Sequence, residues 1–196
     1  RFIVRFLYRI RWYLAIIPMI ALIIAWLMTG NLGKDYTVKT TIYTGIISGY
    51  NIETGTSVSA ANSTVNMANL MHIISTERTL KEVSLRLFAR VMTYGDENQN
   101  NNYILAEHFK ELNASVPQEV KALIDKRSED KTVDNLLAYE RPSAGNYVYG
   151  LLNYGHPYFS IRALSEKIKV ARMENSDLIE IGYSANDPGI AYNTLE

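Results

Sequence analysis

The feature that most limits how this chain can fold is an apolar run near its N-terminus. Residues 12–28, WYLAIIPMIALIIAWLM, contain no charged side chain, and the uncharged stretch continues to Gly33. A helix of about 17 residues rises about 26 Å and one of about 22 residues about 33 Å, whereas the hydrocarbon core of a bilayer is about 30 Å thick. We therefore predict a transmembrane helix over residues 12–33, preceded by a basic juxtamembrane segment, residues 1–11.

Two other interpretations of the run are weaker. A buried core helix of this length would carry a polar stripe, and a cleaved signal peptide would have a shorter apolar region followed by a small-residue cleavage site. Several side chains also suit a membrane anchor, because arginines precede the run, aromatic residues occur where an interfacial belt is expected, and the one proline lies near the N-terminal end. These residues are Arg9, Arg11, Trp12, Tyr13, Pro18 and Trp26.

The distribution of charge predicts the orientation of this anchor. Residues 1–34 hold five of the 20 Lys and Arg residues and none of the 20 Asp and Glu residues, so residues 35–196 carry 15 basic and 20 acidic side chains. Basic residues favour the cytoplasmic side, which places the N-terminus in the cytoplasm of a bacterium, against anionic membrane lipids, and the main domain in the periplasm. A mildly acidic body is poorly suited to nucleic acid, and the chain has no cysteine for disulfides or thiolate metal sites.

The rest of the chain predicts an α+β fold, in which a membrane-proximal antiparallel or mixed sheet packs with helices. Residues 35–45 alternate and are rich in Thr, Val, Ile and Tyr, which indicates a strand. Apolar stripes at helical spacing follow in residues 67–74 and 80–88. We assign residues 34–91 and 157–196 to an α/β base domain in two segments, and residues 92–156 to a mainly helical insertion standing away from the sheet.

The end of the chain has the clearest local pattern. KIKVARM and LIEIGYS alternate and are separated by ENSD, which predicts an antiparallel hairpin. Asp187 is a strong N-cap candidate, and Pro188 suits the first helical position because its missing N–H has no partner there. At the earlier helix boundary, Ser75 or Thr76 can serve as the cap.

Catalytic, cofactor and metal sites are not apparent in the sequence. The three histidines, His72, His108 and His156, are scattered, and we interpret each as a surface or interface residue. No nucleophile motif occurs, and the acidic pairs lie in charged surface runs. We therefore expect no catalytic residue, no cofactor and no metal. The tyrosine-rich stretch GNYVYGLLNYGHPYF has two interpretations, since interleaved aromatic rings can stack on sugars or pack under a short loop.

The order of these parts resembles the Wzz-type chain-length determinants, or polysaccharide co-polymerases, of the bacterial inner membrane. Three stretches carry the resemblance: RIRWYLAIIPMIALIIAWLM with the following strand YTVKTTIYTG, then NLMHIISTERTLKEVSLRL, and finally IKVARMENSDLIEIGYSANDPGIAYNTLE, the most specific of the three. It covers residues 1–91 and 157–196 in outline, and residues 92–156 depart from it. The residues that match the family's structural pattern are Ser75, Ile179, Ile181, Tyr183, Asp187, Pro188 and Ala191.

This resemblance implies a non-catalytic protein with two membrane helices that bracket a periplasmic α/β base. Subunits of such proteins form a homo-oligomeric ring, which governs how many repeat units a polysaccharide polymerase adds to a lipid-linked glycan. The glycan would be O-antigen, capsule or exopolysaccharide, and any tyrosine-kinase domain would lie outside these residues. Two alternatives stay open: an extracytoplasmic ligand-sensing domain of a signalling receptor, and a periplasmic subunit of an export machine.

Overall fold

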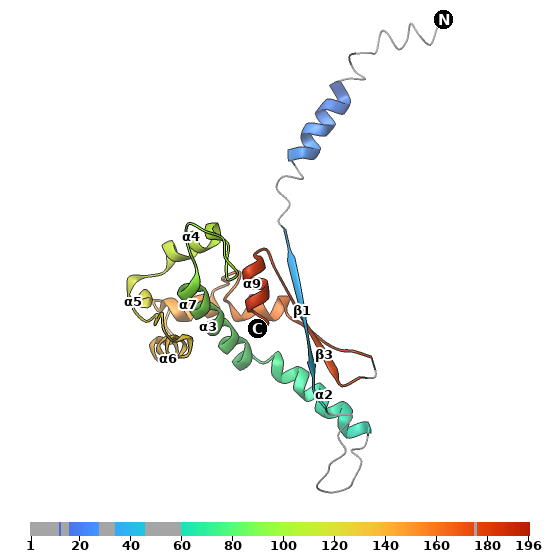
Figure 1. Ribbon diagram of the computed structural model, residues 1–196, viewed down its shortest axis with the longest axis vertical. Helices are drawn as coiled ribbons and strands as arrows, with labels where there is room; N and C mark the ends of the chain where they lie inside the picture. Colours follow the sequence, from blue (N-terminus) through green and yellow to red (C-terminus); the bar gives the residue numbers. More distant parts are fainter. Residues whose placement is uncertain (1–11, 13–15, 28–33, 46–59, 175) are drawn as a thin grey trace, which may run out of the picture. The chain divides into compact units, whose positions relative to one another are not determined.

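The computed structural model describes residues 12, 16–27, 34–45, 60–174 and 176–196 (Figure 1). It divides into two compact units, Arg1–Lys34 and Asp35–Glu196. In the first unit, residue 12 and residues 16–27 are helical, and all of these side chains are exposed. Within the described ranges, no helix combines the length and the hydropathy needed to cross a bilayer. Part of the predicted 12–33 helix lies outside those ranges, as do Arg9, Arg11 and Tyr13.

The second unit has the predicted α+β character and contains a three-stranded antiparallel sheet. Its strands are β1 (Tyr36–Tyr43), β2 (Lys169–Arg172) and β3 (Leu178–Ala185), in the order β1-β3-β2. The predicted hairpin is confirmed, because β2 and β3 are antiparallel neighbours. The first strand also pairs with β3, which brings Val38 opposite Tyr183.

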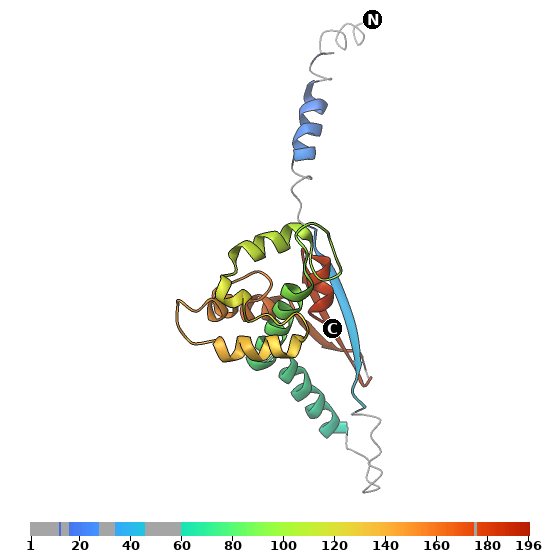
Figure 2. The same cartoon turned by 60° about the vertical axis from the view of Figure 1, so that its left-hand side comes forward.

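The alternation in β3 separates a buried face from an exposed one. Ile179, Ile181, Tyr183 and Ala185 are buried on the face that packs against helices. On the other face, Lys39 pairs with Glu180 at 2.9 Å and the Thr37 hydroxyl lies 2.8 Å from that of Ser184. Figure 2 shows the helices of this unit on one side of the sheet. The sheet therefore presents one apolar and one polar face, as the period of two predicts.

Helices make up most of the second unit. The first predicted apolar stripe is partly buried, with Met67 packed on Ile179 and Ile181. Leu80, Leu87 and Phe88 of the second stripe enter the main core. The helices are α2 (Ala60–Ile74), α3 (Glu77–Tyr94), α4 (Ala106–Ser115), α5 (Gln118–Lys121), α6 (Glu129–Tyr139), α7 (Tyr147–Asn153), α8 (Ile161–Lys167) and α9 (Pro188–Asn193).

Side-chain caps define several helix starts. Of the two candidates before α3, Thr76 is the N-cap and accepts the N–H of Thr79, whereas the Ser75 hydroxyl donates to the carbonyl of Met71 at the end of α2. Asp187 caps α9 and Pro188 occupies its first turn, as predicted. Short polar side chains favour these positions because they satisfy N–H groups that lack a partner inside the helix.

The helices of residues 92–156 share the core of the rest of the unit. Phe109 and Leu112 of α4 and Val133 and Leu136 of α6 belong to the same buried cluster as Phe88 and Tyr183. We expected this segment to stand away from the sheet, but its apolar side chains are buried in one cluster with those of α3 and β3. Residues 35–196 consequently form one compact unit.

Candidate functional site

The Asp187 carboxylate makes polar contacts with segments that are far apart in the sequence. Its side chain is fully buried, and its Oδ1 atom accepts the N–H groups of Gly189 at 2.9 Å and Ile190 at 3.2 Å. These two hydrogen bonds are the N-cap that the sequence predicts. They occupy one oxygen of the carboxylate and leave the other for partners elsewhere in the chain.

The second oxygen, Oδ2, binds the start of α4. It accepts the N–H of Leu105 at 2.9 Å and lies 2.7 Å from Nδ1 of His108. Since a carboxylate only accepts, Nδ1 of His108 carries the donated proton. One buried side chain thus joins the first turn of α9 to the first turn of α4, and we call this cluster of Asp187, His108 and Leu105 the Asp187 junction.

Tyr158 borders the Asp187 junction. Its hydroxyl lies 3.4 Å from Nδ1 of His108, whose proton is already directed at Asp187. Burial raises the pKa of Tyr158 to about 12, and the negative charge of Asp187 adds to the rise. The phenol therefore stays protonated at neutral pH. With all four carboxylate bonds made to donors of the chain itself, the arrangement is suited to holding two segments together.

A close backbone approach accompanies these hydrogen bonds. A Cβ atom at Gly189 would lie 2.4 Å from the carbonyl carbon of Tyr103 and 2.6 Å from the N atom of Ile104. Asn193 adds a further bond, because its side-chain amide donates to the carbonyl of Asn102 at 2.8 Å. One face of α9 is therefore in direct contact with the loop before α4.

Tyr183 lies on the buried face of β3 and differs from its neighbours in polarity. Its hydroxyl is buried without a hydrogen-bond partner, and burial raises the pKa of the phenol to about 12. The nearby Thr194 side chain counteracts part of this rise in the pKa of Tyr183. The Thr194 hydroxyl itself donates its hydrogen to the carbonyl of Ile190 at 2.7 Å. Among the predicted pattern residues, Ile179, Ile181, Tyr183 and Ala191 are all core residues.

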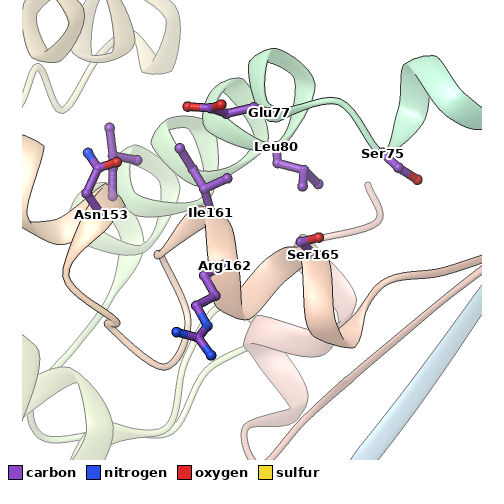
Figure 3. Close-up of a pocket in the computed structure, with 8 residues that line it drawn as sticks. Ser75, Glu77, Leu80, Asn153, Ile161, Arg162 and Ser165 are labelled. Carbon is purple, nitrogen blue, oxygen red and sulfur yellow. The ribbon is translucent and has the colours of Figure 1, made fainter.

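Ser75 lines a surface hollow of about 370 Å³. Residues around the α2–α3 boundary form one wall of this Ser75 hollow, and α7 and α8 form the other (Figure 3). In the figure the carboxylate of Glu77 and the guanidinium of Arg162 extend away from each other. Arg162 instead pairs with Glu166 of its own helix at 2.8 Å. The lining thus gathers no convergent set of charged groups.

The sequence did not reveal the environments of two histidine side chains. We interpreted each histidine as a surface or interface residue, but His108 belongs to the Asp187 junction and His156 is only partly exposed. Burial lowers the pKa of His156 to about 4. His108 is 79 residues from Asp187 in sequence, so no local spacing could have indicated their contact.

The described residues contain no group of three or more His, Asp or Glu side chains placed to hold a metal ion. Comparison of the chain with protein-family models, with curated proteins and with solved structures finds no match in any of the three.

Proposed function

We propose that this chain is a non-catalytic, membrane-anchored regulator of polysaccharide chain length, of the Wzz type. The observation that carries the proposal is the antiparallel pairing of β1 with β3, which is followed directly by the Asp187 cap of α9. A strand that leaves the anchor is thereby joined to the strand–Asp-Pro–helix pattern on which the resemblance rests. The base of such a regulator needs this link between anchor and helix.

The proposed anchor is the apolar run that begins at residue 12. Every described side chain from 16 to 27 is exposed, and Trp12 and Trp26 are 67% and 76% exposed. An apolar surface of this extent is unfavourable in water, and we propose that the inner-membrane bilayer surrounds it. The basic residues before it, including Arg9 and Arg11, then keep the N-terminus in the cytoplasm, and the main domain lies in the periplasm.

The proposed partners are further copies of the chain, a polysaccharide polymerase and its lipid-linked glycan. Apolar side chains stay exposed on β1 and α2, among them Tyr43, Val65 and Ile73. Such residues suit subunit contacts in a homo-oligomeric ring. A ring repeats one weak glycan or polymerase contact many times, so the total affinity exceeds that of any single contact.

Deletion of the gene in the source bacterium tests the proposal. We expect the length distribution of a surface glycan, resolved as a ladder on a gel, to lose its modal length, and the wild-type gene to restore it. The double variant Leu22→Arg and Ile23→Arg should fail to restore it, because each arginine opposes insertion by about 3 kcal/mol at the centre of a membrane helix. A control with Tyr192→Ala, at an exposed position of α9, should restore it. An unchanged ladder in the deletion strain would overturn the proposal.

A ligand-sensing domain is the second candidate, and the surface hollows favour it. The Ser75 hollow, of about 370 Å³, is within the range of small-molecule sites, which is about 300–1,000 Å³. A sensor would bind a signal molecule and leave glycan length unaffected by the deletion. The same deletion strain therefore separates the two candidates.

A further inference from the structure

A second and larger hollow lies among the helices that the family resemblance does not cover. It has a volume of about 540 Å³ and is lined by the end of α4, by α5, by the loop before α7, by α7 itself and by the turn after α7. We call it the Tyr154 hollow. Gly155 has a φ of +85°, a conformation that favours glycine, and this turn brings both Tyr154 and His156 into the lining.

The ring of Tyr154 is held in place and still exposed. It meets Tyr149 edge to face, with 5.9 Å between ring centroids, and lies against Gly150, where a Cβ atom would be 3.4 Å from the ring. The residue is nevertheless 64% exposed. An exposed aromatic ring that is already fixed can stack on the C–H face of a pyranose with little loss of side-chain entropy.

Polar groups of the lining offer both acceptors and donors. Glu119 uses its Oε1 atom to accept the Tyr139 hydroxyl at 2.8 Å, and its side chain is exposed. The Ser115 hydroxyl donates to the carbonyl of Leu112 at 2.8 Å and lies 3.2 Å from the Tyr147 hydroxyl, so Ser115 serves a ligand as an acceptor. His156 accepts the N–H of Tyr158 through Nδ1 at 3.2 Å, so its neutral ring carries the proton on Nε2 as a donor.

The charge of the lining selects the class of ligand. Its described residues include no Lys or Arg, and its one charged side chain is Glu119. Phosphate, sulfate and carboxylate ligands require a cation or several N–H groups, so an anionic sugar or a nucleotide is disfavoured. Hydroxyl groups that both donate and accept suit this lining well.

We propose that the Tyr154 hollow is a binding subsite for one or two uncharged hexopyranose units of a glycan. Tyr154 forms the stacking platform, and Glu119, Ser115 and His156 bind the ring hydroxyls. The choice of a glycan as ligand rests on the proposed function. The assignment itself depends on the stacking ring and the hydroxyl-binding groups of this hollow.

Saturation-transfer NMR on the full chain in detergent micelles tests the subsite. The probes are methyl glycosides of glucose, galactose and N-acetylglucosamine, with methyl glucuronoside as the anionic comparison. We expect transfer to the ring protons of at least one neutral probe and a weaker effect for the glucuronoside. Absence of transfer to every neutral probe overturns the proposal.

Four variants locate the binding. Tyr154→Ala should weaken binding about 2- to 10-fold, the range for one aromatic contact, and Tyr154→Phe should retain it. Tyr192→Ala removes another exposed tyrosine, outside the hollow, and should bind like the wild type. Glu119→Ala, also exposed, should weaken binding about threefold or more. Wild-type binding by Tyr154→Ala or by Glu119→Ala, with circular dichroism that shows a folded chain, overturns the proposal.

The test of the sugar subsite can fail or succeed independently of the test of the proposed function. Sugar binding together with an unchanged glycan ladder in the deletion strain would retain the subsite and reject the chain-length role. An altered ladder without sugar binding would retain the role and reject the subsite.

Discussion

At the scale of single residues, Asp187 combines two tasks in one side chain. As an N-cap alone it would contribute about 1 kcal/mol. The structure adds the N–H of Leu105 and the ring of His108 as further partners of a carboxylate that has no exposure to solvent. Removal of such a group leaves several buried donors unsatisfied, and that loss is larger than the loss of a cap.

We therefore expect Asp187→Ala to lower the free energy of unfolding by about 2–4 kcal/mol, measured by urea denaturation. Asp187→Asn is the matched control, because its amide oxygen can still cap α9 while its NH2 group faces the donors of α4. Its loss should fall between that of the alanine variant and zero. A loss of only about 1 kcal/mol for Asp187→Ala would mean that the bonds to α4 contribute nothing.

His156 makes stability depend on pH. Its pKa in the folded chain is about 4, below the usual 6.5, because burial disfavours the charged ring. Between these two values the unfolded chain binds more protons than the folded chain. The contribution of His156 is therefore complete above about pH 6.5 and declines as the pH falls towards 4.

From pH 7 to pH 5 we expect the wild type to lose about 1–2 kcal/mol more unfolding free energy than His156→Gln. Urea denaturation at a series of pH values measures this difference in slope. His72 and His108 are present in both proteins, so the comparison isolates the effect of His156. Equal slopes would show that the imidazole is hydrated in the folded chain.

At the scale of elements, α9 shows how a short helix gains its position from contacts made far away in sequence. It has six residues, too few to be stable alone. Its first turn is held by the Asp187 junction, and Gly189 allows the backbone at Tyr103 and Ile104 to approach. The helix is therefore stabilised by the loop before α4 as well as by the strand it follows.

Gly189→Ala should destabilise the chain by about 1–3 kcal/mol or more, because the added methyl group would meet backbone atoms that cannot rotate away. Gly182→Ala is the control. Gly182 is also buried, but its Cβ atom would have its nearest contact at 3.8 Å, so we expect a change within about 1 kcal/mol. Thermal unfolding followed by circular dichroism compares the two variants. Equal melting temperatures would contradict the close approach at α9.

At the scale of the whole molecule, residues 35–196 form one compact unit, although the sequence predicted a base domain in two segments with an insertion between them. The core of α3 is covered by side chains of α4 and α6, and ion pairs reinforce the contact. Arg90 lies 3.1 Å from Glu129, and Arg86 lies 3.0 Å from Asp130. The exposed pair of Arg86 contributes little, so the buried apolar contacts dominate the stability of this assembly.

Replacement of residues 97–156 by a glycine–serine linker should therefore abolish cooperative unfolding, because Phe88 and Tyr183 would lose the side chains that cover them. Removal of residues 1–34, which form a separate compact unit, is the control and should leave a single transition. Urea unfolding monitored by far-ultraviolet circular dichroism measures both. A cooperative transition in the linker variant would mean that the base folds without the insertion.

Local sequence patterns predicted several strands and helices, but they did not predict the tertiary contacts between them. The strand Tyr36–Tyr43, the hairpin and the Asp187 cap were all predicted, because alternation and capping depend on residues a few positions apart. The choice of Thr76 over Ser75 was left open, since both have the required hydroxyl. The hollows and the Asp187 junction were not predicted.

The sequence by itself determined which stretches are apolar, which of them alternate as strands, and that the last helix begins after Asp187. These properties follow from side-chain chemistry and the fixed periods of the backbone. Only the tertiary structure decided that residues 92–156 complete the core and that Asp187 binds His108. Contacts of that kind join residues 79 positions apart, and their geometry depends on how the whole chain packs, which no local period encodes.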